Sequence, residues 1–298
     1  MTEKISNLRL YYIQRSNNTY IKINVNNKNY FITESVDDKN KDFYQIEINI
    51  EEILKDNFVL KFEKILKEKR IKKIYFRLNI FQLDLNQYSE VLNLLKENNY
   101  QTSKIEILKL NLTEDYIELK KNLRRSYKSL INKENKFLKV KFSNDCDNKK
   151  KIIEDWIEIY STALLKGDII LNKETYKTLE KAIQQDECLL SVAYENSKPL
   201  GGMLFAFNKN YARYDAAANI NEVEIDKSRS VGHYLMWNSI VQLKKMKFNN
   251  LELGSYYNFK LNKDISLNKI EKLNNIINFK KGFGAEVITT NYFFKLFD

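Results

Sequence analysis

The chain has 298 residues, and its hydrophobic content of 43% excludes a disordered protein even though 30% of the residues are charged. This length exceeds the ~100–200 residues of a usual single domain, so we expect two domains or two closely packed halves. The formal net charge of +11 suits polyanionic partners such as RNA, nucleotides or coenzyme phosphates, and it favours peripheral contact with an anionic membrane.

Short strands open the chain, and helices then alternate with strands. β-Branched and aromatic residues mark the strands, and the asparagine-rich residues 26–29 mark the turn of a hairpin. Apolar residues at helical spacing mark the helices. In chain order we predict strands at 9–14, 20–25 and 30–33, a helix at 50–69, a strand at 73–78, a helix at 85–98 and a strand at 103–110.

A long amphipathic helix is predicted next, with Thr113 as a suitable N-cap. Its first turn is acidic, and lysines and arginines then cover one face. A solvated surface explains such a face as well as contact with phosphates does, so both interpretations stay open. The residues that would form a basic wall against phosphates are Lys121, Arg124, Arg125 and Lys128.

The rest of the chain predicts helices around an antiparallel meander of three strands. Polar turns at residues 196–199 and 208–210 separate these strands. We predict helices at 152–165 and 173–185, strands at 188–195, 200–207 and 211–218, a helix at 232–246, a strand at 250–253, a loop at 254–264, a helix at 266–280 and a strand after residue 284. Together these elements predict an α+β fold of mixed sheets flanked by helices.

A weak internal repeat predicts two related halves. Residues 66–76 correspond to residues 243–253, because apolar residues match at a constant spacing and both segments run from a helix through a short turn into a strand. We therefore divide the chain into residues 1–112 and 113–298.

The loop before the helix at 232–246 is a candidate phosphate site. Backbone N–H groups of Ser230, Gly232 and His233 would lie at the helix N-terminus, where they can bind an anion. Arg229 adds a fork-shaped donor. The first half has no arginine and glycine at the corresponding positions. An ordinary turn between a strand and a helix explains the same residues, so this alternative also stays open.

A second candidate site lies where the helix at 266–280 ends. Glycine is scarce in this chain, with 7 residues, yet Gly282 and Gly284 bracket an aromatic residue directly after Lys280 and Lys281. This pattern predicts a sharp turn beside concentrated positive charge, which suits an anionic ligand or a developing oxyanion. A plain helix cap with solvated lysines explains the pattern equally well.

The second half carries the motifs of a family resemblance. In chain order these motifs are the basic helix, followed by residues 156–165, 211–218, 232–237, 251–255 and 279–284. This order resembles the Fem family of peptidoglycan-bridge aminoacyltransferases and its relatives in the GNAT N-acyltransferase superfamily, from about residue 110 to the end. The resemblance implies two tandem GNAT-like halves, a degenerate first half and a second half with the acyl-donor groove.

The resemblance also implies roles for single residues. Its Phe-Lys-x-Gly-Phe pattern places Lys280 at the reacting carbonyl or at the donor's phosphates, where Lys281 would assist in binding. Its Arg-x-x-Gly pattern gives Arg229 and Gly232 a phosphate-binding role. Tyr234 stands at the position where many acetyl-CoA-dependent members have a second small residue. This difference weakens the coenzyme A interpretation. The long helical hairpin arm of some Fem proteins is absent from the pattern.

Aminolysis of an ester or thioester needs a held carbonyl and an oxyanion donor, but no metal and no covalent enzyme intermediate. A chain with one histidine, and with two cysteines that lack metal-ligand spacing, fits this chemistry. We expect no permanently bound cofactor, with aminoacyl-tRNA or acyl-CoA as co-substrate. Asp215 and Glu252 are candidate proton acceptors, and Tyr256 or Tyr257 is a candidate acid for the leaving group.

We therefore expect an acyltransferase that moves an aminoacyl or acyl group to an amine on a cell-envelope precursor, amino sugar or peptide. Its expected partners are tRNA or coenzyme A and an anionic acceptor, and not DNA. The alternatives are an acyl-CoA-dependent N-acyltransferase of an amino sugar or small metabolite and, from another class, a non-catalytic RNA-binding protein. Because neither a membrane-length apolar run nor an apolar leader stands out, we expect a cytoplasmic protein.

Overall fold

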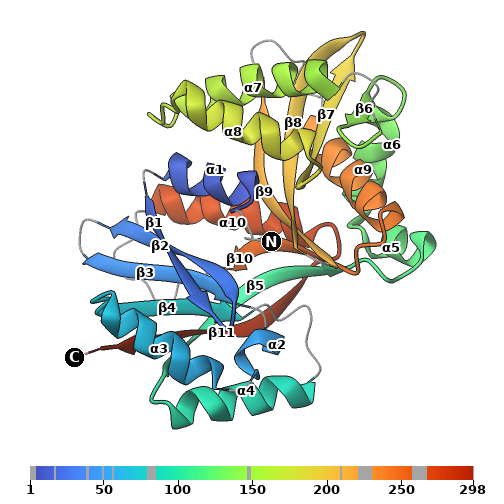
Figure 1. Cartoon of the computed structure of the whole chain (residues 1–298). Coiled ribbons are helices and arrows are strands. Elements are labelled where there is room, and N and C mark those ends of the chain that lie inside the picture. Colours follow the sequence, from blue (N-terminus) through green and yellow to red (C-terminus); the bar gives the residue numbers. More distant parts are fainter. Residues whose placement is uncertain are drawn as a thin grey trace. The chain divides into compact units, whose positions relative to one another are not determined.

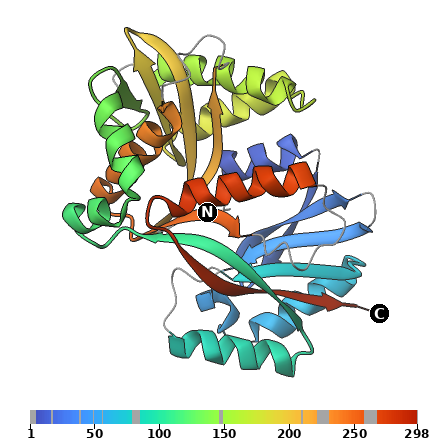
Figure 2. The same cartoon turned by 180° about the vertical axis from the view of Figure 1, so that it is seen from behind.

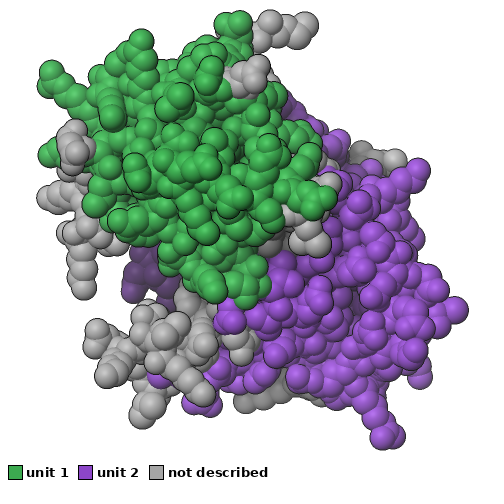
Figure 3. Space-filling model, turned by 90° about the horizontal axis from the view of Figure 1, so that it is seen from below, with its two compact units in different colours: residues 1–105, 289–298 green, residues 106–288 purple. Residues whose placement is uncertain are grey.

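The chain divides into two compact units in the computed structural model. The first unit comprises Met1–Ile105 and Thr289–Asp298, and the second comprises Glu106–Ile288 (Figure 3). The predicted division at residue 112 and the predicted repeat stay predictions. Within the described ranges no helix is long and apolar enough to cross a membrane. The structure describes residues 5–16, 18–37, 40–48, 50–55, 57–78, 85–145, 149–208, 210–220, 230–256 and 267–297.

The first unit is built on a sheet in which β1, β2, β3, β4 and β11 lie side by side in that order (Figure 1). Neighbouring strands are antiparallel, except that β3 and β4 are parallel. Its core includes Phe62, Leu66, Ile74 and Phe293, each at most 2% exposed. The elements are α1 (Asn7–Arg15), β1 (Thr19–Val25), β2 (Lys28–Asp37), β3 (Asn40–Ile48), α2 (Ile50–Ile53), α3 (Phe58–Glu68), β4 (Lys73–Leu78), α4 (Leu85–Glu97) and β11 (Glu286–Leu296).

The strand predicted at residues 9–14 is wrong, because this segment belongs to α1. Leu8 and Tyr11 lie about one helical turn apart, and both are buried. The side chain of Ser6 caps the helix by accepting a hydrogen bond from the backbone N–H three residues later, at 3.2 Å. Burial at helical spacing and a good cap therefore outweigh the β-propensity of the aromatic residues.

The hairpin predicted around residues 26–29 is confirmed. β1 and β2 pair in antiparallel register, and the turn residues Asn26 and Asn27 have φ values of 51° and 64°, as a tight hairpin turn requires. The single helix predicted over 50–69 is wrong, because the chain breaks at Asn57, with φ 55°, between α2 and α3. The prediction also missed β3 and the short edge strand β6.

The second unit is built on a sheet with the strand order β5, β10, β9, β8, β7, β6 (Figure 1, Figure 2). β10 is parallel to β9, and the other neighbours are antiparallel. The predicted meander is therefore confirmed as β7, β8 and β9. These strands are β5 (Gln101–Asn111), β6 (Lys139–Phe142), β7 (Cys188–Glu195), β8 (Lys198–Asn208), β9 (Tyr211–Asn219) and β10 (Asn250–Tyr256).

Helices cover both faces of this sheet. Trp156 of α7 packs so closely on Gly202 that a Cβ there would lie 2.6 Å from its indole. Gly202 pairs with Val192, so the neighbouring residue Ser191 points to the other face of the sheet. There Ser191 accepts a hydrogen bond from Ser239 of α9 at 2.8 Å. The helices are α5 (Tyr116–Asn122), α6 (Arg125–Glu134), α7 (Lys149–Leu165), α8 (Lys173–Gln184), α9 (Val231–Lys245) and α10 (Leu267–Lys281).

The long basic helix predicted from Thr113 is wrong, because the segment forms the two helices α5 and α6. Asp115, not Thr113, caps α5 by accepting from the backbone N–H of Glu118 at 2.8 Å. Leu123 and Arg124 between the helices have extended backbone, with ψ of 139° and 137°. Leu123 is buried, at 4% exposed, so a core contact interrupts the helix where the charge pattern alone would continue it.

Two β-bulges lie where β9 and β10 run beside each other. Asp215 is the extra residue in the pairing of β9 with β8, and Leu253 is the extra residue in the pairing of β10 with β5. The parallel pairing covers Asn250–Glu252 of β10 and residues 211–213 of β9. Tyr214 and Gly254, which follow this paired segment, both lie beside the ammonium group of Lys280.

Candidate active site at the end of helix α10

The ammonium group of Lys280 lies over the ring of Tyr214, with 5.3 Å from Nζ to the ring centroid. Gly254 of β10, with φ 92°, lies beside it, since a Cβ there would be in van der Waals contact with Nζ at 3.4 Å. Burial lowers the pKa of Lys280, and the negative charge of Glu252 partly opposes this effect. Lys280 therefore brings a desolvated positive charge to the point where β9 and β10 stop pairing.

The glycine turn predicted after α10 is confirmed. Gly284 has φ 88°, a conformation that favours glycine. Gly282 is required for a different reason, because a Cβ there would lie 2.2 Å from the ring of Tyr127. The Tyr127 hydroxyl donates to a carbonyl of the last helical turn at 3.2 Å, and the backbone N–H of Arg124 donates to the Gly282 carbonyl at 2.8 Å. The segment between α5 and α6 thus holds the helix end that carries Lys280.

A groove with a volume of about 740 Å³ opens beside Lys280, which is within the usual size range of small-molecule sites. Burial, followed by the charge of Asp215, raises the pKa of Tyr214 to about 12, so this hydroxyl keeps its proton at neutral pH. The groove offers charged, amide and aromatic groups to a ligand. Its lining consists of Tyr214, Glu271, Lys272, Asn275, Ile276, Phe279 and Lys280.

The predicted proton acceptors lie on the two bulged strands. Glu252 of β10 is 3% exposed, and its charge acts on Lys280. Asp215 of β9 adjoins Tyr214 in the chain and acts on its hydroxyl. The backbone of Tyr256 ends β10, but its side chain and the whole of Tyr257 lie outside the described residues. The structure therefore brings Lys280 and Glu252 together and leaves the acid role of the two tyrosines a prediction.

The N-terminus of α9 contains part of the predicted phosphate loop. The backbone N–H of Ser230 donates to Oε1 of Glu134 at 3.1 Å, and Glu134 is fully buried. A carboxylate is well placed at the positive end of a helix, where it takes a donor that a phosphate would otherwise use. Arg229, the predicted guanidinium donor, lies outside the described residues.

The next turn of α9 is packed against the end of α10. The imidazole of His233 meets the Tyr127 ring edge-on at 4.3 Å and the Phe279 ring at 5.0 Å between centroids. Burial, followed by the charge of Arg124, lowers the pKa of His233, so the ring is neutral at neutral pH. A Cβ at Gly232 would make an ordinary contact with Phe279, at 4.0 Å, so the fold does not require glycine there for space. The phosphate-binding roles of this turn and of Lys281 stay predictions.

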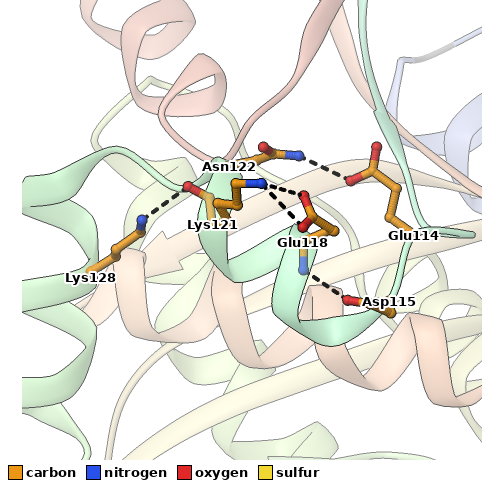
Figure 4. Close-up of polar contacts among 6 residues, drawn as sticks. All are labelled: Glu114, Asp115, Glu118, Lys121, Asn122 and Lys128. Atoms are coloured by element: carbon orange, nitrogen blue, oxygen red, sulfur yellow. Dashed lines mark hydrogen bonds and ion pairs between the residues drawn. The ribbon is translucent and has the colours of Figure 1, made fainter.

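The residues of the predicted basic wall make contacts within the protein. Lys121 pairs with Glu118 at 3.2 Å, and Lys128 donates to the Lys121 carbonyl at 2.9 Å (Figure 4). The guanidinium of Arg124 makes a long hydrogen bond of 3.4 Å to a carbonyl near the end of α10. Arg125 is exposed at the start of α6. These contacts tie α5, α6 and α10 together, and a role in phosphate binding stays a prediction.

Sequence reasoning missed Tyr214, although it lies in a segment that carried the family resemblance. Its position as an aromatic residue directly before Asp215 was the available signal, but the contact of its ring with Lys280 joins β9 to the end of α10, which are far apart in the sequence. Among the residues that the structure describes, no group of three or more histidine, cysteine, aspartate or glutamate side chains could hold a metal ion.

Solved structures with similar folds include "FemX", with a TM-score of 0.67 and 10% identity over 96% of this chain and 91% of that chain. The structure of L-PGS from Bacillus licheniformis matches with a TM-score of 0.60 and 10% identity, over 98% of this chain and 93% of that chain. The C-terminal domain of a protein assigned as a lysylphosphatidylglycerol synthetase, from Agrobacterium fabrum, matches with a TM-score of 0.62 and 10% identity. This match covers 98% of this chain and 88% of that chain.

The sequence itself matches no protein-family model and no curated protein. The structural similarity nevertheless extends over nearly the whole of each chain. The protein therefore has a Fem-like fold, and the predicted α+β fold class and fold resemblance are confirmed.

Proposed function

We propose that this protein is an acyltransferase that moves an aminoacyl group from an activated donor to an amine. The observation that carries the proposal is the position of Lys280, whose partly buried ammonium lies over Tyr214 beside a 740 Å³ groove. A positive charge in a partly desolvated site stabilises a developing oxyanion more strongly than it would in water. The Fem-like fold supports the same class of reaction by analogy.

The reaction requires one bond to form and one to break at a carbonyl carbon. The acceptor amine attacks the donor ester, the carbonyl oxygen becomes an oxyanion, and the Lys280 ammonium donates a hydrogen bond to it. Glu252 or Asp215 takes the proton of the attacking amine. The bond to the donor oxygen then breaks, and this oxygen receives a proton from Tyr256, Tyr257 or water. The products are an amide and the free donor alcohol.

The geometry at α9 favours aminoacyl-tRNA over acyl-CoA as the donor. The buried Glu134 side chain accepts from the Ser230 N–H, so a pyrophosphate at this helix end would find that donor already used. An ester on the end of an RNA can react at Lys280 while its phosphates bind elsewhere on a protein of net charge +11. The names of the similar proteins support an acceptor in the cell envelope.

The alternative within enzymes is an acyl-CoA-dependent N-acyltransferase of an amino sugar or small metabolite, and it uses the same Lys280. A non-catalytic RNA-binding protein is the alternative from another class. Thermal stabilisation separates the donors, because a ligand at 100 times its dissociation constant adds ~2.7 kcal/mol. We expect stabilisation by aminoacyl-tRNA and by a nucleotide-linked cell-wall precursor, and none by coenzyme A.

Replacing Lys280 tests the proposal directly. Lys280→Ala should lower turnover about 10²–10³-fold, the effect of losing one oxyanion donor, with little change in melting temperature. Lys281→Ala is the comparison variant and should lower turnover less, because this neighbouring lysine is exposed. Wild-type turnover in Lys280→Ala would disprove the role of Lys280, and RNA binding without transfer to any amine would favour the non-catalytic alternative.

A further inference from the structure

A second, smaller pocket lies among α5, α6 and α9; in Figure 1, α5 lies below α6 and α9. Its volume is about 200 Å³, below the ~300–1,000 Å³ of sites for whole drug-sized ligands, so it accommodates one ring system. Three asparagines, two lysines and three aromatic residues face it. The lining is Tyr116, Lys120, Leu123, Lys128, Ile131, Asn132, Asn135, Tyr234, Trp237, Asn238 and Val241.

Tyr116 offers exposed aromatic surface to this pocket, and the buried ring of Trp237 lies next to it. Trp237 is 5% exposed, whereas Tyr116 is 46% exposed, and their ring centroids lie 5.6 Å apart. Lys120 holds its ammonium 6.0 Å from the Tyr116 ring. A planar ligand can therefore stack on an aromatic side chain while its negative charge remains near a lysine.

Amide groups supply both kinds of hydrogen bond. Asn135 uses its carbonyl oxygen to accept from the Tyr234 hydroxyl at 3.1 Å, which leaves its NH₂ group to donate to a ligand. Asn238 uses its NH₂ group to donate to the Tyr234 carbonyl at 2.8 Å, which leaves its side-chain oxygen to accept. Lys128 makes one bond to the Lys121 carbonyl and has two further ammonium hydrogens.

We propose that this pocket binds one unstacked nucleotide, with the base against Tyr116 and the asparagine amides and the phosphate at Lys120 and Lys128. A base edge needs both donors and acceptors, a base face needs an aromatic platform, and a phosphate needs cations, and the pocket contains all three. The nucleotide is either free or part of a single-stranded RNA. The inference rests on the pocket alone, so it does not depend on acyl transfer at Lys280.

Equilibrium titrations of the full chain with AMP and with a short single-stranded RNA test this site. Tyr116→Leu should weaken binding about 10-fold or more, because stacking of a base on an aromatic ring is lost. Lys120→Gln should weaken binding and reduce its dependence on salt. The matched controls are Ile117→Ala, one position from Tyr116 and 72% exposed, and Lys136→Gln, an exposed lysine that does not line the pocket.

The two ligands distinguish the sources of the nucleotide. Tight binding of the RNA with weak binding of AMP, both sensitive to Tyr116→Leu, identifies an RNA strand, and equal affinities identify a free nucleotide. Either result supports the site. Failure of both ligands to bind the wild type at millimolar concentration would overturn it, and so would equal affinity in the wild type and Tyr116→Leu. Loss of turnover in Lys280→Ala leaves these titrations unchanged, so the two proposals fail separately.

Discussion

The two units treat partly buried charge in different ways. In the first unit, the Glu52 carboxylate accepts hydrogen bonds from Tyr30 at 2.6 Å, Lys55 at 2.7 Å and Lys28 at 3.1 Å. In the second unit, Lys280 has an aromatic ring and a glycine beside its ammonium, and within the described residues no carboxylate forms an ion pair with it at 4.0 Å or less. The first arrangement neutralises a charge, and the second keeps a charge available.

The titration of the two groups follows from this difference. Burial alone would raise the pKa of Glu52, but hydrogen bonds from Lys55, Tyr30 and Lys28 lower it to about 2. For Lys280 the effect of burial is larger than the effect of the Glu252 charge, so the pKa of Lys280 is lowered. Burial therefore disfavours its charged form. A desolvated charge beside a groove, with no ion pair among the described residues, is typical of a functional site, whereas a fully paired charge is typical of a structural one.

The largest effect that we expect on stability comes from the turn that positions Lys280. Gly282→Ala should destabilise the protein by about 3 kcal/mol, because the new methyl group would lie 2.2 Å from the Tyr127 ring. Gly232→Ala is the control, since its methyl group would make only an ordinary contact with Phe279, at 4.0 Å, and alanine favours a helix. Chemical denaturation measures both, and equal stabilities would show that the end of α10 adjusts without cost.

Neutral replacements of the two charged groups should have opposite effects. Glu52→Gln should cost roughly 1–3 kcal/mol at neutral pH, because a pKa lowered from 4.5 to about 2 stabilises the folded state. This stabilisation is present above about pH 4.5 and is lost as the pH falls towards 2, so the variant's stability should depend less on pH in that window. Lys280→Met should be as stable as the wild type or more stable, since a desolvated charge is removed. Destabilisation by Lys280→Met would contradict the contrast between the units.

The pH dependence of turnover gives the smallest and most specific test. Activity that needs the Lys280 ammonium should fall at alkaline pH, at a lower pH than for an ordinary lysine, because burial lowers this pKa. Lys280→Arg should move this fall in activity, the alkaline limb of the pH profile, to higher pH, since arginine keeps its proton. Glu252→Gln should move it to lower pH, because the charge of Glu252 raises the pKa of Lys280. A limb that stays in place in both variants would exclude Lys280 as the titrating group.

The sequence by itself determined most of the second unit. Strand β7 was predicted with its observed bounds, and the helices at α7, α8, α9 and α10 were predicted within a few residues, because long periodic segments and turn residues are local signals. The glycine turn after Lys280 was also readable, since scarce glycine in a close pair marks a special backbone. The Fem-like fold was inferred from the order of these motifs and agrees with the similar structures.

Only the tertiary structure decided what these elements do together. The basic helix divides because Leu123 enters the core and Arg124 binds the end of α10, and no local pattern encodes a contact between residues so far apart. Tyr214 lies beneath Lys280 because the fold brings β9 and the end of α10 together, although they are far apart in the sequence. Propensity and periodicity act over a few residues, whereas burial, bulges and desolvation depend on what the rest of the chain places around a side chain.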